Sequence, residues 1–242
     1  MRTETGENGG RYYIVDEDNN IKLPSVTTIL GNMQDKSGLD SWIARVGEKK
    51  AKEISTFSAN RGTFMHVLHE HYLNSFFVDP VEKPLMEAFK LALEECNTLT
   101  KEEIACGKDL FMQFHNKSDF YEHIGEVLHQ EVPVWSLLGG GYAGRLDLCI
   151  KDKDGKIKVI DFKTSRKPKI ESWIDGYKMQ TAAYSIGLYE QYGIFPEETE
   201  IWISCETGEV QTFRMNKEDI KHWFSKFQEL VIGYHEKFPT KK

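Results

Sequence analysis

Two neighbouring stretches decide the fold of this chain: Gly144-Arg-Leu-Asp-Leu-Cys-Ile150 and Lys158-Val-Ile-Asp-Phe-Lys-Thr164. Both are rich in residues that favour strands, and the intervening Asp152-Lys-Asp-Gly155 is a turn signal. We therefore expect two antiparallel strands joined by a tight turn. Such a hairpin brings Asp147, Asp161 and Lys163 to one end of the paired strands.

These three side chains have the chemistry of a metal site with a cation beside it. Because side chains alternate along a strand, Asp161 and Lys163 share one face and Phe162 points to the other. The two carboxylates, with the backbone carbonyl of Phe162, are hard oxygen ligands for a divalent cation. Bound Mg²⁺ activates water and stabilises charge on a phosphate, while Lys163 orients the water or hydrogen-bonds the phosphate. Taken singly, an Asp beside a Lys at a strand end is more often a solvated turn or an ion pair.

The pattern on either side of the hairpin predicts the rest of the fold. Alternation around 126–132 indicates a third antiparallel strand, which Gly139-Gly140-Gly141 interrupts. After Pro168 we expect a helix over 171–192, a hairpin of 200–204 with 210–215, and a closing amphipathic helix over 217–237. Upstream, a strand at 11–15 with a turn at 16–20 precedes expected helices, which are 39–54, 58–77 with Ser58 as cap, 81–95 and 101–116.

Composition excludes several classes of protein. The chain has 242 residues, a net charge of -7 and 40% hydrophobic residues, which argues against disorder and against coating nucleic acid by bulk positive charge. No apolar run is long enough to cross a bilayer, and no secretory signal is visible, so we expect no membrane contact. The four cysteines lie far apart without a C-x-x-C pair, which favours reduced thiols in a cytoplasmic compartment. No Walker motif is present, so ATP dependence is not encoded.

Four motifs in order resemble the PD-(D/E)xK nuclease superfamily, and specifically its RecB-type exonuclease branch. They are Arg61-Gly-Thr-Phe-Met-His66, Gly144 to Asp147, Asp161 to Lys163, and Gln180 to Tyr184. That branch includes the mitochondrial genome maintenance exonuclease and the Cas nucleases of adaptation, and the match spans about Pro24 to Tyr192. The proline that names the superfamily is missing before Asp147, and the scattered cysteines do not form the iron–sulfur pattern of some members, so we expect no cluster.

The resemblance implies an α/β fold with a restriction-endonuclease-like core, in which helices flank a mixed central sheet. We expect one nuclease domain over 1–242, with a mainly helical N-terminal addition at 37–116 that arches over the active site. Lys49, Lys50 and Lys52 belong to that addition and would help to thread a free strand.

Carried over residue by residue, the resemblance also implies roles. Asp147, Asp161 and Lys163 are catalytic, and Mg²⁺ or Mn²⁺ is held by His66, Asp147, Asp161 and the carbonyl of Phe162. Gln180 and Tyr184 hold the site or the DNA backbone. By composition alone, a His on an apolar helix face is usually a core or surface residue.

Further residues are candidates for substrate binding. Arg61 and Arg145 suit bidentate phosphate contacts, although surface ion pairs are the ordinary alternative. Glu131 is expected to contact the metal's surroundings or the DNA, or to be an exposed strand carboxylate. Glu70 ranks lower. A group of basic and aromatic side chains near the site suits a single-strand groove, and it comprises Lys163, Arg166, Lys167, Lys169, Lys178, Trp173 and Tyr177.

We therefore expect a metal-dependent DNA exonuclease that prefers single-stranded ends and acts in recombination, repair or degradation. The resemblance leaves room for partner proteins from those processes, and it suggests a bacterial or phage-infected cell, with an organellar location left open. One alternative is an endonuclease for duplex or branched DNA on the same site. Another is a DNA-binding module with little catalysis, against which the intact Asp147, Asp161 and Lys163 argue. Polarity, oligomeric state and the choice between DNA and RNA are not encoded in a readable motif.

Overall fold

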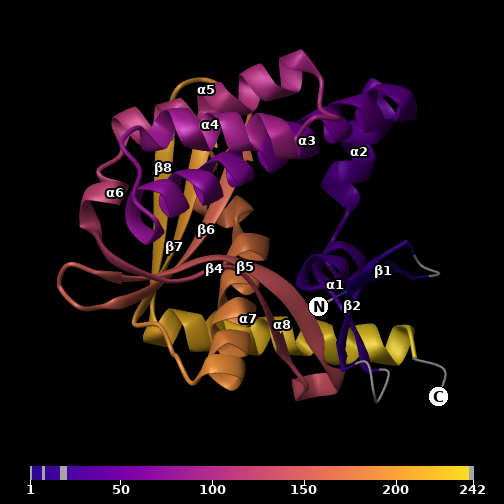
Figure 1. Cartoon of the computed structure of the whole chain (residues 1–242). Helices are drawn as coiled ribbons and strands as arrows, with labels where there is room; N and C mark the ends of the chain where they lie inside the picture. The colour runs from indigo at the N-terminus through magenta and orange to yellow at the C-terminus, as the bar shows by residue number, and fades with distance from the viewer. Residues whose placement is uncertain (1, 7–8, 17–20, 240–242) are drawn as a thin grey trace.

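A five-stranded mixed sheet forms the centre of the computed structural model, which describes residues 2–6, 9–16 and 21–239 (Figure 1). Its strand order is β4-β5-β6-β7-β8, and only β6 and β7 run parallel. The strands are β4 (Ile124–Ser136), β5 (Tyr142–Asp152), β6 (Ile157–Ser165), β7 (Glu198–Cys205) and β8 (Val210–Asn216). The expected meander of three antiparallel strands and the expected hairpin near the C-terminus are both present.

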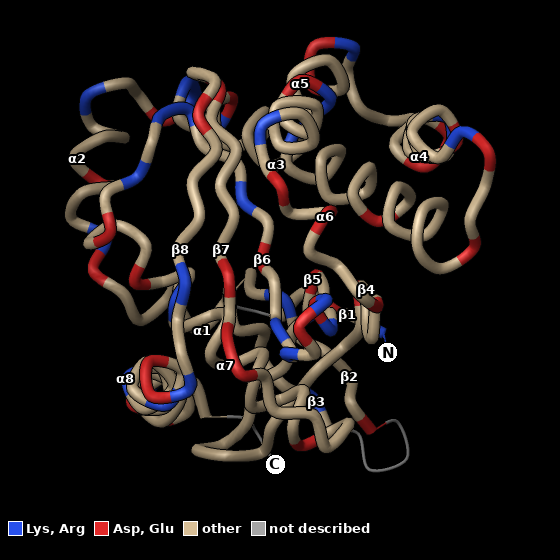
Figure 2. The backbone as a smooth tube through the Cα atoms, turned by 90° about the vertical axis from the view of Figure 1, so that its left-hand side faces the viewer, with Lys and Arg blue, Asp and Glu red and all other residues tan. Residues whose placement is uncertain are grey.

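Helices cover both faces of this sheet, as Figures 1 and 2 show from two directions. One face carries α3 (Glu48–Leu73), α4 (Pro84–Glu95) and α5 (Lys101–Lys117), and the other carries α7 (Asp175–Tyr192) and α8 (Lys217–Lys237). Each layer has its own apolar core: Phe64 and Phe111 belong to the first, and Leu188 and Phe227 to the second. This arrangement confirms the expected α/β fold with helices flanking a mixed sheet.

A smaller N-terminal unit packs beside the main sheet. The strands β1 (Arg2–Thr5), β2 (Arg11–Asp16) and β3 (Ile21–Pro24) form an antiparallel sheet, and α1 (Val26–Met33) follows it. The side chain of Ser25 caps α1, and a bridge to Ala143 ties this segment to β5. The expected strand at 11–15 is confirmed, but most of the turn expected at 16–20 lies outside the described residues. Short elements complete the chain, namely η1 (Asn74–Val78), α6 (Phe120–His123), η2 (Leu138–Gly140) and η3 (Glu171–Trp173).

The expected helix boundaries before residue 78 were wrong. The chain forms α2 (Ser37–Val46) and then a continuous α3, so Ser58 lies inside a helix and caps nothing. The break falls at Gly47, whose φ of 86° is a conformation that other residues rarely adopt. No Gly or Pro interrupts the chain just before Ser58, so nothing stops the helix there. Likewise, α4 begins at Pro84 rather than Val81, because proline is well suited to the first helical position.

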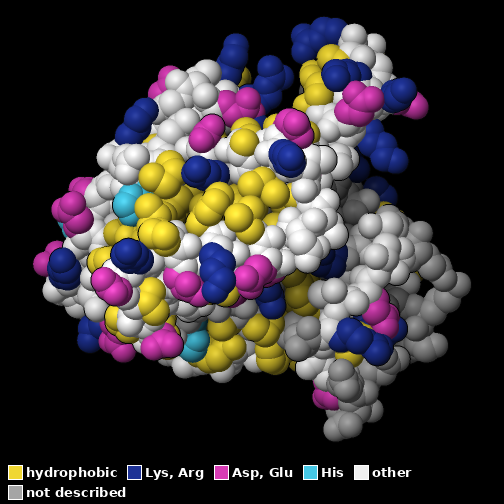
Figure 3. Space-filling view, turned by 45° about the horizontal axis from the view of Figure 1, so that its top comes forward, with side chains coloured by type: hydrophobic (Ala, Val, Ile, Leu, Met, Phe, Trp, Pro, Cys, Tyr) yellow, Lys and Arg dark blue, Asp and Glu magenta, His cyan; other side chains and the backbone are white. Residues whose placement is uncertain are grey.

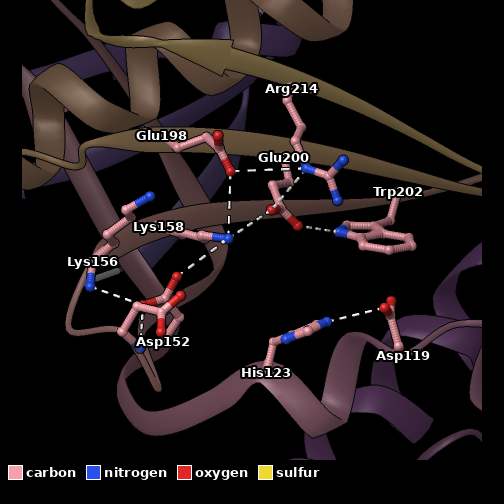
Figure 4. Close-up of polar contacts among 10 residues, drawn as sticks. Asp119, His123, Asp152, Lys156, Lys158, Glu198, Glu200, Trp202 and Arg214 are labelled. Carbon is pink, nitrogen blue, oxygen red and sulfur yellow. Dashed lines mark hydrogen bonds and ion pairs between the residues drawn. The ribbon is translucent and has the colours of Figure 1, made fainter.

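The end of the sheet away from the motif residues is fixed by a network of charges (Figure 4). The Nζ of Lys158 on β6 lies 3.4 Å from Asp152, 3.4 Å from Glu198 and 3.0 Å from Glu200. Arg214 on β8 reaches Glu200 at 3.3 Å. Glu200 is buried, and its pairing with two cations compensates for the loss of water. The network therefore connects β5, β6, β7 and β8.

The outer surface of the layer formed by α3, α4 and α5 carries exposed apolar side chains, visible in yellow in Figure 3. The exposed large apolar residues of η1, the loop after it and α4 are Phe76, Val78, Val81, Met86 and Leu93. Among the residues that the structure describes, no helix is long and apolar enough to span a bilayer. All four cysteines are free thiols, and Cys96, Cys149 and Cys205 are buried.

Candidate active site

The strands β5 and β6 separate at the motif residues. Their pairing ends at Leu148 opposite Ile160, whereas β5 continues along β4 and β6 continues along β7. Asp147 lies directly past the point of separation, and its Oδ2 accepts a hydrogen bond of 2.8 Å from the backbone N–H of Phe162. The side chain of Asp147 thus takes the place of a backbone hydrogen bond between β5 and β6, and the two strands diverge beyond this point. We call this point of divergence the fork.

A group of three potential metal ligands meets at this fork. His66 on α3, Glu131 on β4 and Asp147 on β5 each offer one atom, and these atoms lie within 4.8 Å of one another. The Nδ1 of His66 is 3.5 Å from the Oδ2 of Asp147. Glu131 has a φ of 49°, which is uncommon for a residue with a side chain, and such strain is typical of functional positions. The His and the two carboxylates come from three different elements.

Asp161 and Lys163 lie beside this group on β6. The carboxylate of Asp161 is buried, forms an ion pair with Lys163 and accepts a 3.3 Å hydrogen bond from the Nε2 of Gln180 on α7. The same Nε2 lies 3.1 Å from the hydroxyl of Tyr184. The ring of Phe162 points to the opposite face, as the strand alternation predicts, and stacks on His69 with centroids 4.1 Å apart.

A cleft of about 540 Å³ opens over these residues. The predicted site residues that line it are His66, Glu131, Arg145, Asp147, Phe162, Lys163, Gln180 and Tyr184. Asp161 lies behind the lining. Arg61 is buried, pairs with Glu206 and faces a neighbouring cavity instead. Lys178, expected in the basic group, is buried and lies 2.8 Å from Glu171.

The closely spaced charges shift several pKa values. Burial and the charges of Asp147 and Glu70 raise the pKa of Glu131 to about 8. Burial and Asp147 raise the pKa of Asp161 to about 7, against the lowering effect of Lys163. Burial disfavours the charged form of Lys163, but its carboxylate neighbours outweigh this and raise its pKa. Burial and the charge of Lys163 lower the pKa of His66. Glu131 and Asp161 therefore tend to keep their protons in the absence of a cation. A bound cation would favour their ionised forms and displace these protons.

The N-terminal unit contributes a wall that sequence reasoning missed. Arg11, Tyr13, Ser25 and Thr27 all line the cleft. No local pattern indicated them, because no spacing links these residues to others more than a hundred positions away. The bridge between Ser25 and Ala143 is what brings this segment to the site.

Position 144 has no room for a side chain larger than that of glycine. A Cβ at this position would lie 2.3 Å from a ring carbon of Tyr184, so the first residue of the G-x-x-D motif allows the tyrosine to pack against β5. We expect Gly144→Ala to lower the free energy of unfolding by about 1–3 kcal/mol, as overpacked cores do. Urea denaturation measures this change.

A double-mutant cycle separates that clash from other effects. With Tyr184→Ala in place, the added alanine at position 144 should cost little, because the contacting ring is gone. An equal cost in both backgrounds would contradict the steric explanation.

Comparison with known proteins adds a family match. The model of the PD-(D/E)XK nuclease superfamily matches residues 40–241. A crystal structure of a candidate exonuclease from Eubacterium rectale is similar over 70% of this chain and 68% of its own, with 13% identity and a TM-score of 0.42. The crystal structure of SSO0001 is similar over 74% and 76%, with 17% identity and a TM-score of 0.37. No curated protein matches the sequence.

Proposed function

This chain belongs to the PD-(D/E)XK nuclease superfamily, and from that premise we propose that it is a metal-dependent exonuclease that degrades single-stranded DNA from its ends. The observation that carries the proposal is the meeting of His66, Glu131 and Asp147 at the fork of β5 and β6, beside the pair of Asp161 and Lys163. Carboxylates and a lysine in one cleft suit hydrolysis of a phosphodiester.

The residues at the fork fit a divalent cation. Glu131 and Asp147 supply the hard oxygen atoms that Mg²⁺ and Mn²⁺ prefer, and His66 adds a nitrogen that Mn²⁺ accepts more readily than Mg²⁺. We propose that these three residues hold the ion, with Asp161 and the carbonyl of Phe162 as further ligands. The ion supplies positive charge that stabilises the reacting phosphate and makes water a better nucleophile.

Lys163 acts as a cation rather than as a base. Because neighbouring carboxylates raise its pKa, the ammonium group keeps its proton at neutral pH. It can therefore donate hydrogen bonds to a phosphate oxygen or orient water, and it adds positive charge that stabilises the reacting phosphate. Gln180 and Tyr184 position Asp161 from α7. Arg145 at the rim is 59% exposed and lies 3.7 Å from Glu131, and a phosphate bound there would share the guanidinium with that carboxyl group.

The helical addition favours action on a free strand. We propose that residues 37–116 arch over the site within a single domain, so that DNA reaches the cleft by threading an end. A role in recombination, repair or degradation, with partner proteins of those processes, follows from the RecB-type resemblance, as does a place in the cytoplasm of a bacterial or phage-infected cell.

Digestion of end-labelled linear single-stranded DNA, compared with a closed single-stranded circle, tests this function. We expect loss of the linear strand with Mg²⁺ or Mn²⁺ and none with EDTA, while the circle survives. Cutting of the circle would replace the proposal with an endonuclease. Binding without cleavage of either substrate would replace it with a DNA-binding module. The same assay with single-stranded RNA shows whether the enzyme prefers DNA or RNA as its substrate.

Metal affinity should rise with pH. In the metal-free protein Glu131 holds its proton up to about pH 8 and Asp161 up to about pH 7, so a cation must displace these protons. Each displaced proton adds up to tenfold in affinity per pH unit, and we expect a steep rise to pH 7 and a shallower one to pH 8. Titration calorimetry with Mn²⁺ at several pH values measures this.

Glu131→Gln provides the control for that profile. The rise between pH 7 and 8 should disappear, and the slope below pH 7 should fall to about half, because only the proton of Asp161 is then displaced. The metal-free wild type should also lose stability as pH rises from 4.5 to about 8, because the folded state keeps a proton that an unfolded Glu releases. An affinity that does not change between pH 6 and 8 would contradict this assignment of the protons.

A further inference from the structure

A second cavity of about 430 Å³ adjoins the cleft. Ser58 and Thr164 line both cavities and mark the junction between them. The other residues around the second cavity are Arg61, Ser165, Arg166, Lys167, Pro168, Lys169 and Trp173. We call this second cavity the basic pocket.

Helix α3 runs past both cavities, and the charges change sign along it. Glu70 lies at one end of the cleft, His66 beside the ligand group, and Gly62 and Ser58 towards the basic pocket. At 1.5 Å per residue, Ser58 and Glu70 are about 18 Å apart. Along α3 the chain runs from the basic pocket to the cleft, whereas along β6 it runs from the cleft to the basic pocket. Phe162 lines the cleft, and Arg166, just beyond the strand, lines the basic pocket.

The far end of the cleft is acidic. Glu95 lines it together with Glu70 and Glu131. Arg145, the cation beside these groups, is already 3.7 Å from Glu131, so this end of the cleft attracts phosphate groups less than unpaired cations do. A DNA strand that reaches the metal site is therefore favoured on the side of the basic pocket.

The basic pocket contains cations that the protein itself does not neutralise. In the described part of the chain, none of Arg166, Lys167 and Lys169 forms an ion pair with a carboxylate, whereas Arg61 pairs with Glu206. Arg61 is 2% exposed, and its Nε forms no hydrogen bond with any described residue.

An aromatic side chain stands at the rim of the same pocket. Trp173 is 65% exposed, although it follows a buried stretch of β6 and a short loop. Exposed aromatic rings beside basic residues are the platforms on which unpaired bases stack, because every base offers a flat apolar face. In a duplex that face is already covered by the neighbouring base pairs.

We propose that the basic pocket holds the uncut part of a single strand, with its phosphodiester backbone on Arg166, Lys167 and Lys169 and a base on Trp173. The strand then passes Gly62, beside Thr164 at the junction, and its end lies over the proposed metal site, short of Glu70 and Glu95. This inference rests on the proposed function. Because strand binding is measured without cleavage, an experiment can refute the binding pocket without refuting the function, and the reverse.

Anisotropy of a labelled single-stranded oligonucleotide in EDTA tests the pocket directly. Removing the charges of Arg166, Lys167 and Lys169 together, each to alanine, should weaken binding and lower the slope of log affinity against log salt by about 2, since each phosphate contact in a single strand contributes about 0.7. The matched control removes three exposed lysines away from both cavities, namely Lys101, Lys151 and Lys221, and should leave the slope unchanged. Equal effects in the two triple variants would overturn the proposal.

Trp173→Ala tests the stacking contact. We expect about tenfold weaker binding of the single strand and no matching loss for a duplex of the same sequence. Equal losses for the two substrates would overturn a stacked, unpaired base. Oligonucleotides with and without a terminal phosphate should bind alike, and affinity that depends on that phosphate would replace the backbone site with a site for strand ends.

Gly62 tests the continuity of the path. Only Thr164 lies near a Cβ at this position, at 3.6 Å, so Gly62→Ala fits and leaves the junction open. Gly62→Leu fills the junction without removing a charge, and leucine is a better helix former than glycine. We expect several-fold weaker binding for the leucine variant than for the alanine variant, and equal binding would overturn the proposed path.

The outcome of these measurements is separable from that of the digestion assay. Wild-type protein that binds the strand through the basic pocket but cleaves nothing with Mg²⁺ or Mn²⁺ would refute the proposed function and support the pocket. Cleavage with no effect of the pocket variants on binding would refute the pocket and leave the function in place.

Discussion

Lys163→Ala is expected to lower the rate of DNA cleavage by about a thousandfold, which is the loss seen when a donor that stabilises transition-state charge is removed. The side chain is 17% exposed and pairs with the buried Asp161. Its loss also raises the pKa of Asp161 further, because the charge of Lys163 lowers that pKa. The carboxyl group then keeps its proton at neutral pH. Single-turnover kinetics with saturating metal measure the effect.

The variant must be shown to fold, because removing one member of a buried pair can cost about 3–5 kcal/mol. Circular dichroism and strand binding in EDTA provide this check. Lys101→Ala, which removes an exposed charge outside the cleft, is the control and should cleave at the wild-type rate. A Lys163→Ala enzyme that folds and keeps more than a tenth of that rate would remove Lys163 from the mechanism.

Asp147→Asn should abolish both metal binding and cleavage, with a rate loss of at least a thousandfold. The amide oxygen can still accept the 2.8 Å hydrogen bond from Phe162, so the fork between β5 and β6 is preserved while the charge is lost. Two of the three grouped ligands then remain, and one of them is Glu131. Calorimetry with Mn²⁺ and digestion of linear DNA measure the two losses.

A second consequence distinguishes loss of charge from loss of structure. Because Asp147 raises the pKa values of Glu131 and Asp161, both should fall in the Asp147→Asn protein. The metal-free variant is therefore expected to be more stable than the wild type at pH 8, and thermal denaturation in EDTA tests this. Wild-type metal affinity in the variant would exclude Asp147 as a ligand.

Local patterns predicted the parts of the fold that depend on local chemistry. The hairpin of β5 and β6 followed from strand-forming residues around Gly155. The amphipathic pattern predicted α8 with its observed bounds, and the structure adds the cap at Asn216. The break at Gly47 was missed because its reading as a helix stop requires a positive φ that the sequence does not display. The prediction that a helix starts at Ser58 was wrong because serine is compatible both with a helix cap and with a helix interior.

In the candidate site, too, local patterns predicted some features, whereas features that depend on tertiary contacts were missed. Strand alternation placed Asp161 and Lys163 on one face, and the structure has Phe162 on the other. The left-handed backbone of Glu131 and the wall from the N-terminal unit depend on tertiary contacts, so no local pattern indicated them. Lys178 was misplaced because a lysine on a helix gives no sign of whether a partner such as Glu171 will draw it inward.

The parallel pairing of β6 with β7 determines when the site can be assembled during folding. The turns between β4, β5 and β6 are short, so this meander consists of local contacts that form quickly, whereas β7 reaches β6 only after the whole of α7 has crossed over. The same crossover helix delivers Gln180 to Asp161. On the ribosome, a chain that has not yet emerged past residue 205 therefore lacks the complete strand that pairs with β6, so the candidate site can be fixed in place only after β7 has emerged.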